Sequence, residues 1–215
     1  MKQRTALIAG ASGLVGGECL QRLLASEAYA KVTVVTRHAL GPAAQHPKLR
    51  EIVIDFAQLD RIKTELRADH VFCALGTTIR KAGSQAKFRQ VDFEYPRHLA
   101  QLTLARGARH FSLVSALGAS SKSGVFYSRV KGELEDALRA MHWPSLCILR
   151  PSVIAGDRKE SRSLERLSEM VLRFGPVTYR PVAASKIAAA MVATAQRESA
   201  GVTILESREI PRAAG

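Results

Sequence analysis

Seven short runs of β-branched and other apolar residues alternate with stretches of helical period along this chain of 215 residues. The runs are 5–9, 32–36, 52–54, 70–74, 110–115, 145–149 and 202–205. Strands that are separated by helices form right-handed crossover units, which build a parallel sheet with helices on both faces. The alternation therefore predicts an α/β fold with a doubly wound parallel sheet of about seven strands.

Apolar residues at helical spacing predict helices over 14–24, about 92–106, about 127–141 and 186–196. Asp92 and Ser185 are the predicted N-caps of the second and fourth of these helices, and Gly107 is the predicted stop of the second. The segment 157–181 is patterned more weakly and is expected to form a small lid near the C-terminal edge of the sheet. Since neither a repeat nor a linker interrupts the pattern, we expect a single domain over 1–215.

The hydrophobic fraction of 47% is that of a globular chain and excludes a disordered or fibrous one. No apolar run approaches the roughly 18 residues of a membrane helix, and no secretory pattern opens the chain, so we expect a soluble, cytoplasmic protein. Cys19, Cys73 and Cys147 lie in apolar segments without metal-ligand spacing. They are predicted to be buried, reduced thiols, and no metal site is expected.

The formal net charge of +13 raises nucleic acid, an anionic membrane or an anionic substrate as partners. Lysine and arginine are scattered, and acidic residues interleave with them, as Glu160 and Glu165 do in the basic stretch after Asp157. Such mixing is typical of a solvated helix face and argues against nucleic-acid or membrane binding as the main role. Arg80, Lys81 and Arg158 are expected near the mouth of a site, where they either recognise an anion or are ordinary surface charges. The sequence leaves the oligomeric state open.

A glycine-rich segment, Gly-Ala-Ser-Gly-Leu-Val-Gly over 10–16, lies between the first strand and the first helix. Glycines at this turn permit a sharp bend, let the backbone approach a pyrophosphate and allow the helix to pack closely on the strand. A glycine-rich turn without a ligand is the alternative, but the combination of strand, spacing and helix favours a dinucleotide cofactor and a Rossmann-type domain. The predicted contacts in this segment are Gly10, Ser12, Gly13, Leu14, Val15 and Gly16.

The residue at the end of the second strand indicates which dinucleotide is bound. NAD-binding domains usually present an acid there for the ribose hydroxyls, whereas this chain has Arg37. An arginine can pair with a 2′-phosphate, so the sequence favours NADP(H), although Arg37 could also be an unpaired surface residue. Asp55, after the third strand, is predicted either to contact the adenine or to cap a helix.

Tyr127 and Lys131 are four residues apart on a predicted helix, so both project from one face. A nearby ammonium stabilises a phenolate, and such a tyrosine can act as acid or base during hydride transfer. Ser115, twelve residues upstream at a strand end, could then orient the substrate oxygen. The alternative for the pair is an exposed helix contact without a catalytic role.

These motifs resemble the short-chain dehydrogenase/reductase superfamily, specifically the atypical branch that includes the Tat-interacting oxidoreductase-like protein and its bacterial relatives. The resemblance rests on the glycine segment, the stretch 73–83, Ser115, the Tyr127–Lys131 pair and the Leu-Arg-Pro-Ser-Val stretch over 149–153. The resemblance implies cofactor contacts from Leu75, Gly76, Thr77, Pro151 and Val153. Asp92 stands near the place of the classical members' asparagine, which puts their complete proton relay in doubt.

Two functions are favoured on the sequence alone, and nucleic-acid binding driven by the positive charge is a third that the scattered charges argue against. The first is an NADP(H)-dependent carbonyl reductase or alcohol dehydrogenase acting on a small molecule, with Tyr127 as acid/base, Lys131 as its electrostatic partner and Ser115 as the positioning hydroxyl. The second is an NADPH-sensing regulatory or partner-binding protein with little turnover.

Overall fold

The structure is a computed structural model that describes residues 3–41, 45–155 and 181–215. The lid predicted over 157–181 lies outside these ranges except for Pro181, as does Arg158. None of the helices in the described ranges has an apolar stretch long enough to cross a bilayer.

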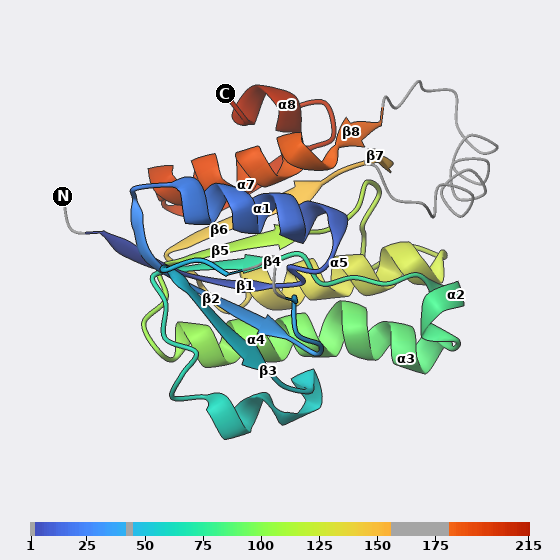
Figure 1. Cartoon of the computed structure of the whole chain (residues 1–215). Helices are drawn as coiled ribbons and strands as arrows, with labels where there is room; N and C mark the ends of the chain where they lie inside the picture. The colour runs from blue at the N-terminus through green and yellow to red at the C-terminus, as the bar shows by residue number, and fades with distance from the viewer. Residues whose placement is uncertain (1–2, 42–44, 156–180) are drawn as a thin grey trace.

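A parallel sheet of seven strands forms the centre of the molecule, as the alternation predicts (Figure 1). Its order is β3-β2-β1-β4-β5-β6-β9, and each neighbouring pair is parallel. The strands are β1 (Arg4–Ala9), β2 (Tyr29–Thr36), β3 (Leu49–Val53), β4 (His70–Cys73), β5 (His110–Val114), β6 (Ser145–Arg150) and β9 (Gly201–Glu206). The order reverses between β1 and β4, and at such a point the chain leaves the two strands in opposite directions and opens a crevice at their carboxyl ends.

Helices cover both faces of this sheet. One layer contains α1 (Leu14–Ala25), α7 (Ala184–Arg197) and α8 (Ile210–Ala213); the other contains the 3₁₀ helix η2 (Phe56–Ile62), α4 (Tyr95–Leu104) and α5 (Phe126–Arg139). Short elements complete the chain: α2 (Ile79–Ala82), α3 (Gln85–Arg89), the π-helical turn η3 (Gln90–Glu94), β7 (Ile154–Ala155) and β8 (Val182–Ala183).

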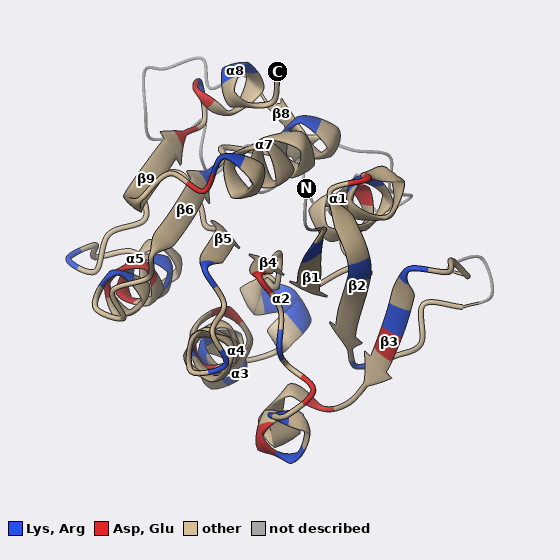
Figure 2. Ribbon diagram, turned by 90° about the vertical axis from the view of Figure 1, so that its left-hand side faces the viewer, with Lys and Arg blue, Asp and Glu red and all other residues tan. Residues whose placement is uncertain are grey.

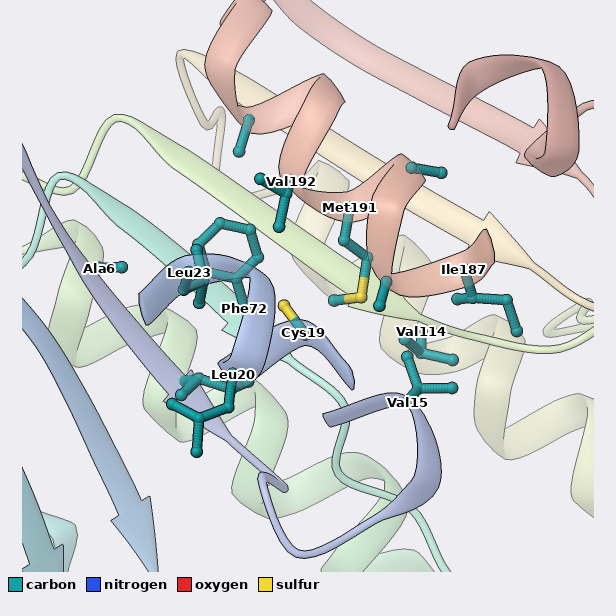
Figure 3. Close-up of a cluster of buried hydrophobic side chains, with 14 of the residues drawn as sticks. Ala6, Val15, Cys19, Leu20, Leu23, Phe72, Val114, Ile187, Met191 and Val192 are labelled. Atoms are coloured by element: carbon teal, nitrogen blue, oxygen red, sulfur yellow. The ribbon is translucent and has the colours of Figure 1, made fainter. Parts of the chain in front are cut away.

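Each layer has its own hydrophobic core, because strands buried on both faces alternate their side chains between the two helix layers. On the first face, Cys19 and Leu23 of α1 meet Phe72 of β4 and Met191 of α7 (Figure 3). On the second, Leu99 of α4 and Leu134 of α5 are fully buried against the sheet. The three cysteines are buried and unpaired, as expected.

Two predicted helix caps are wrong. The segment from α3 through η3 into α4 is continuous, so Asp92 lies inside it, fully buried, and no cap is needed there. The helix predicted from 186 begins two residues earlier, and Ala183 occupies the N-cap position without a side-chain hydrogen bond, which places Ser185 within the first turn of α7. In both cases tertiary packing extends a helix beyond the point where the local sequence suggests a start.

Candidate active site

A cleft of about 610 Å³ opens at the carboxyl ends of the strands beside the topological switch point. It brings together three segments that are far apart in the sequence. Gly10, Ser12 and Gly13 come from the turn after β1, Arg37 from the end of β2, and Leu75, Gly76 and Thr77 from the turn after β4. These seven predicted cofactor residues therefore border one site.

The glycine loop has a geometry that excludes larger residues at two positions. Gly10 has φ +91°, and a Cβ built on it would lie 2.5 Å from the carbonyl oxygen of Ala74. A Cβ on Gly16 would lie 2.0 Å from the carbonyl oxygen of Gly10. The loop therefore packs backbone against backbone and points the N-terminus of α1 toward the cleft, where its unpaired N–H groups suit a pyrophosphate.

The lining of the cleft carries basic side chains. Arg37, His38, Lys81 and Lys87 border it, and no acidic residue does so among the described residues. Figure 2 shows that lysine and arginine are spread over most of the elements in view and that acidic residues accompany them on many of these elements. Arg80, on the neighbouring α2, is exposed and does not line the cleft. A cleft of this composition fits an anionic ligand.

Asp55 caps η2: its Oδ1 accepts a hydrogen bond of 2.9 Å from the backbone N–H of Ala57. The capping alternative from the sequence is therefore the one observed. The next residue, Phe56, lines the cleft and stacks on Tyr95, with ring centroids 5.7 Å apart. These two aromatic rings are among the residues of the cleft wall that sequence patterns did not single out.

Tyr127 and Lys131 lie four residues apart on α5, as the spacing predicts, and neither is among the residues that line the cleft, but Lys131 lies just behind its wall. A Cβ built on Gly76, which lines the cleft, would lie 3.8 Å from the Lys131 Nζ. The Lys131 Nζ is 2.8 Å from the Asp92 Oδ1, and both side chains are almost completely buried. The other oxygen, Oδ2, accepts a hydrogen bond of 2.9 Å from the backbone N–H of Thr77. One carboxylate thus joins the turn after β4 to the helix that carries Tyr127.

This ion pair changes the expected electrostatics of Tyr127. Burial raises the pKa of Tyr127, Lys131 lowers it and Asp92 raises it again, so the net shift is upward. Burial is the largest single effect and lowers the pKa of Lys131, but Asp92, together with Tyr127 and Cys73, raises it by more, so the net shift is upward. Lys131 therefore favours the phenolate, as the sequence predicts, but burial and the Asp92 carboxylate oppose it and keep the pKa of Tyr127 above its usual value.

Ser115 is not brought to the cleft. Its hydroxyl donates a hydrogen bond of 2.6 Å to the Glu135 Oε1, and the residue is only 4% exposed. Glu135 is fully buried on α5 and also pairs with Arg150 of β6, at 3.0 Å to Oε1 and 2.5 Å to Oε2. A hydroxyl that gives its proton to a carboxylate cannot donate it to a substrate oxygen at the same time. The contacts thus place Ser115 in an ion-pair network between α5 and the sheet.

The remaining predicted cofactor residues contribute elsewhere. The side chain of Val15 is buried in the core between α1 and α7, and Leu14 packs against the same core (Figure 3). Pro151 is buried and accepts a backbone hydrogen bond from Leu117, while the Val153 carbonyl accepts one from Val182. None of these four residues lines the cleft in the described part of the chain.

Asp92 is the site residue whose role the sequence did not reveal. Its position near the classical asparagine was visible, but its link to Lys131 needs the π-helical turn that rotates it inward. A lone carboxylate in an amphipathic segment gives no local signal of a partner 39 residues further along the chain.

Comparison with known proteins identifies the family of the chain. The model of a family described as NAD(P)H-binding matches residues 10–198. Rat protein HTATIP2 is 36% identical over 170 residues, which cover 78% of this chain and 70% of the rat protein. The protein FMP52-1, mitochondrial, of Scheffersomyces stipitis is 32% identical over 220 residues and covers 96% of both chains.

Solved structures share the fold. The structure of MoeE5 in complex with UDP-glucose and NAD has a TM-score of 0.74 at 18% identity and covers 94% of this chain and 75% of that one. A UDP-N-acetylglucosamine 4-epimerase from Methanobrevibacter ruminantium has a TM-score of 0.73 at 18% identity, with coverage of 95% and 77%. Together with the glycine loop, these matches show that the chain belongs to the NAD(P)H-binding family, in the atypical short-chain dehydrogenase/reductase branch of HTATIP2 and FMP52.

Proposed function

We propose that this protein is an NADP(H)-dependent oxidoreductase that transfers hydride between the nicotinamide and a carbonyl or alcohol carbon of a small molecule. The proposal rests on one observation: the buried Lys131, on the same helix as Tyr127, lies directly behind Gly76, which lines the cleft. The protein's residues fit the cofactor, since the glycine loop leaves backbone exposed at a helix N-terminus and basic side chains line the cleft.

Each group has a defined task. A bound nicotinamide supplies or accepts the hydride. In this proposal Tyr127 exchanges the proton with the substrate oxygen, and Lys131 would bind the nicotinamide ribose and favour the phenolate form of Tyr127. The basic lining supports an anionic substrate as well as the cofactor phosphates. Location in the cytoplasm stays a prediction, because the fungal relatives carry the word mitochondrial in their names.

Removing the Tyr127 hydroxyl tests the chemistry. Tyr127→Phe is expected to lower the rate of NADPH oxidation with aldehydes and ketones by about 10²–10⁴-fold, the usual contribution of a general acid or base. NADPH affinity, measured by calorimetry, should stay close to that of the wild type. Tyr29→Phe is a matched control. Tyr29 is the first residue of β2, at the end of the strand away from the cleft, and its hydroxyl contacts His70, so its loss should leave turnover intact. Turnover that survives in Tyr127→Phe would overturn the assignment.

The choice of NADP(H) depends on Arg37. We expect NADPH to bind more tightly than NADH, and Arg37→Ala to weaken NADPH binding by about tenfold or more, because one charge-assisted pair with the 2′-phosphate is lost. NADH binding should hardly change, and Arg22→Ala, in the last turn of α1, should affect neither. Paired calorimetric titrations decide the matter: tighter NADH binding, or an equal loss for both cofactors in Arg37→Ala, contradicts the proposal.

A second function, an NADPH sensor with little turnover, is favoured by one observation. The Ser115 hydroxyl is engaged with Glu135, so Tyr127 is the one predicted catalytic hydroxyl that is not held in that network. A sensor would show no turnover with a broad carbonyl panel, together with a partner interaction that responds to NADPH. An interaction indifferent to NADPH would exclude it.

A further inference from the structure

The buried carboxylate of Asp92 makes one contact with the turn after β4, which borders the cleft, and one with α5. Its Oδ1 lies 2.8 Å from the Lys131 Nζ on α5, and its Oδ2 accepts the Thr77 N–H after β4. Asp92 itself is 0% exposed and Lys131 is 4% exposed. Because both side chains are buried, water screens their charges weakly, and the Asp92 carboxylate and the Lys131 ammonium act strongly on each other.

Tyr127 is surrounded by few other charges among the described residues. Lys131 on α5 and Asp92 on η3 are the charged groups that act on it. The ring of Phe88 on α3 packs against the ring of Tyr127, with centroids 5.6 Å apart. Cys73, at the end of β4, contributes to raising the pKa of Lys131. Because Asp92 lies 2.8 Å from the Lys131 ammonium, the pair stabilises a phenolate less than an unpaired ammonium would.

We propose that Asp92 is a positioning residue that offsets part of the charge of Lys131 and helps to keep the buried Tyr127 as a neutral proton donor, so that the site reduces aldehydes or ketones rather than oxidising alcohols near neutral pH. The inference deepens the proposed function and rests on it. It assigns the direction of the reaction and the oxidation state of the substrate.

The proton and electron balance explains the direction. In the reduction, the substrate carbon gains the hydride, the C=O π pair moves to the oxygen, and the Tyr127 O–H bond breaks to supply the proton. The products are the alcohol, the oxidised cofactor and a Tyr127 phenolate that regains a proton from water. The reverse reaction needs the phenolate before it starts, and the burial of Tyr127 together with the Asp92 carboxylate opposes its formation.

Titration of Tyr127 without cofactor tests the inference independently of any substrate. The protein is prepared with tyrosine carbon-labelled at Cζ, the Tyr127 resonance is assigned with Tyr127→Phe, and its NMR shift is followed against pH. Asp92→Asn keeps the size of the side chain and an acceptor for Thr77. It should lower the midpoint of Tyr127 by about one pH unit or more, a tenfold change in proton affinity. Lys131→Met should raise the midpoint.

The double variant Asp92→Asn/Lys131→Met removes both charges and should titrate close to the wild type. If Asp92→Asn does not fold, comparison of Lys131→Met with the double variant measures the same Asp92 effect, again expected as a lower midpoint when the carboxylate is removed. A midpoint that is unchanged or higher after loss of Asp92 overturns the inference, because a purely structural tie to Thr77 would leave the phenol unaffected.

Activity separates this inference from the proposed function. Wild-type protein should reduce members of an aldehyde and ketone panel with NADPH and oxidise the matching alcohols with NADP⁺ poorly at neutral pH. Asp92→Asn should shift the ratio toward oxidation. An unmoved ratio with turnover that depends on Tyr127 refutes the role of Asp92 alone, whereas turnover independent of Tyr127 refutes the proposed function.

Discussion

Replacement of Glu135 by alanine is expected to lower the free energy of unfolding by about 3 kcal/mol, measured by urea denaturation. Glu135 is fully buried, and its two carboxylate oxygens take contacts from Ser115, Arg139 and Arg150. Loss of one partner of a buried ion pair leaves the other uncompensated, which costs about 3–5 kcal/mol. We expect a loss at the lower end of this range because the Arg150 side chain is 19% exposed and still has Glu206 as an ion-pair partner at 2.8 Å.

Glu133→Ala provides the matched control on the same helix. Glu133 pairs with Arg89 at the surface, where both side chains are partly exposed. Exposed pairs contribute about 0–1 kcal/mol, so this variant should unfold nearly like the wild type. Equal losses in the two variants would show that the buried network does not hold α5 against the sheet, contrary to the structure.

Gly16→Ala is expected to weaken NADPH binding by about a hundredfold. The added Cβ would lie 2.0 Å from the Gly10 oxygen and 2.6 Å from the Gly10 carbonyl carbon, and neither backbone atom can move aside like a flexible side chain. Overpacking of this kind costs up to about 3 kcal/mol, which corresponds to about a hundredfold in Kd if it displaces the loop. Calorimetric titration with NADPH measures the change.

The neighbouring glycine offers a control with the opposite sign. A Cβ on Gly17 would meet the Ala11 oxygen at 3.4 Å, an ordinary contact, and the residue lies within α1. Gly17→Ala should therefore leave the Kd for NADPH unchanged and stabilise the protein by about 0.5–1 kcal/mol, because alanine loses less backbone entropy in a helix. Weak binding by both variants would contradict the specific role given to Gly16.

The fold was predictable because its signals are local and repeated. Each strand is an apolar run, each helix shows its period, and parallel pairing through right-handed crossovers follows from their alternation. The glycine loop was readable for the same reason, since Gly10 and Gly16 satisfy a backbone requirement that belongs to one short turn. The spacing of Tyr127 and Lys131 needed only the geometry of a helix.

The details of the site depend on contacts that local patterns do not encode. Ser115 ends a strand as a catalytic serine would, yet its hydroxyl is directed to Glu135, twenty residues further along. Asp92 resembles a helix cap, yet the continuous helix through η3 turns it toward Lys131. In both cases a buried polar group takes the partner that compensates its loss of water, and that partner comes from another element.

Transfer of a labelled hydride tests the central claim most directly. The protein is incubated with NADPH that carries deuterium at the nicotinamide C4, separately in each stereochemical position, and with the aldehyde and ketone panel. Mass spectrometry then follows the label. We predict deuterium on the carbinol carbon of at least one product, from one C4 position, and its loss in Tyr127→Phe that still binds NADPH. Tight NADPH binding without any label transfer across the panel would contradict hydride transfer by this site.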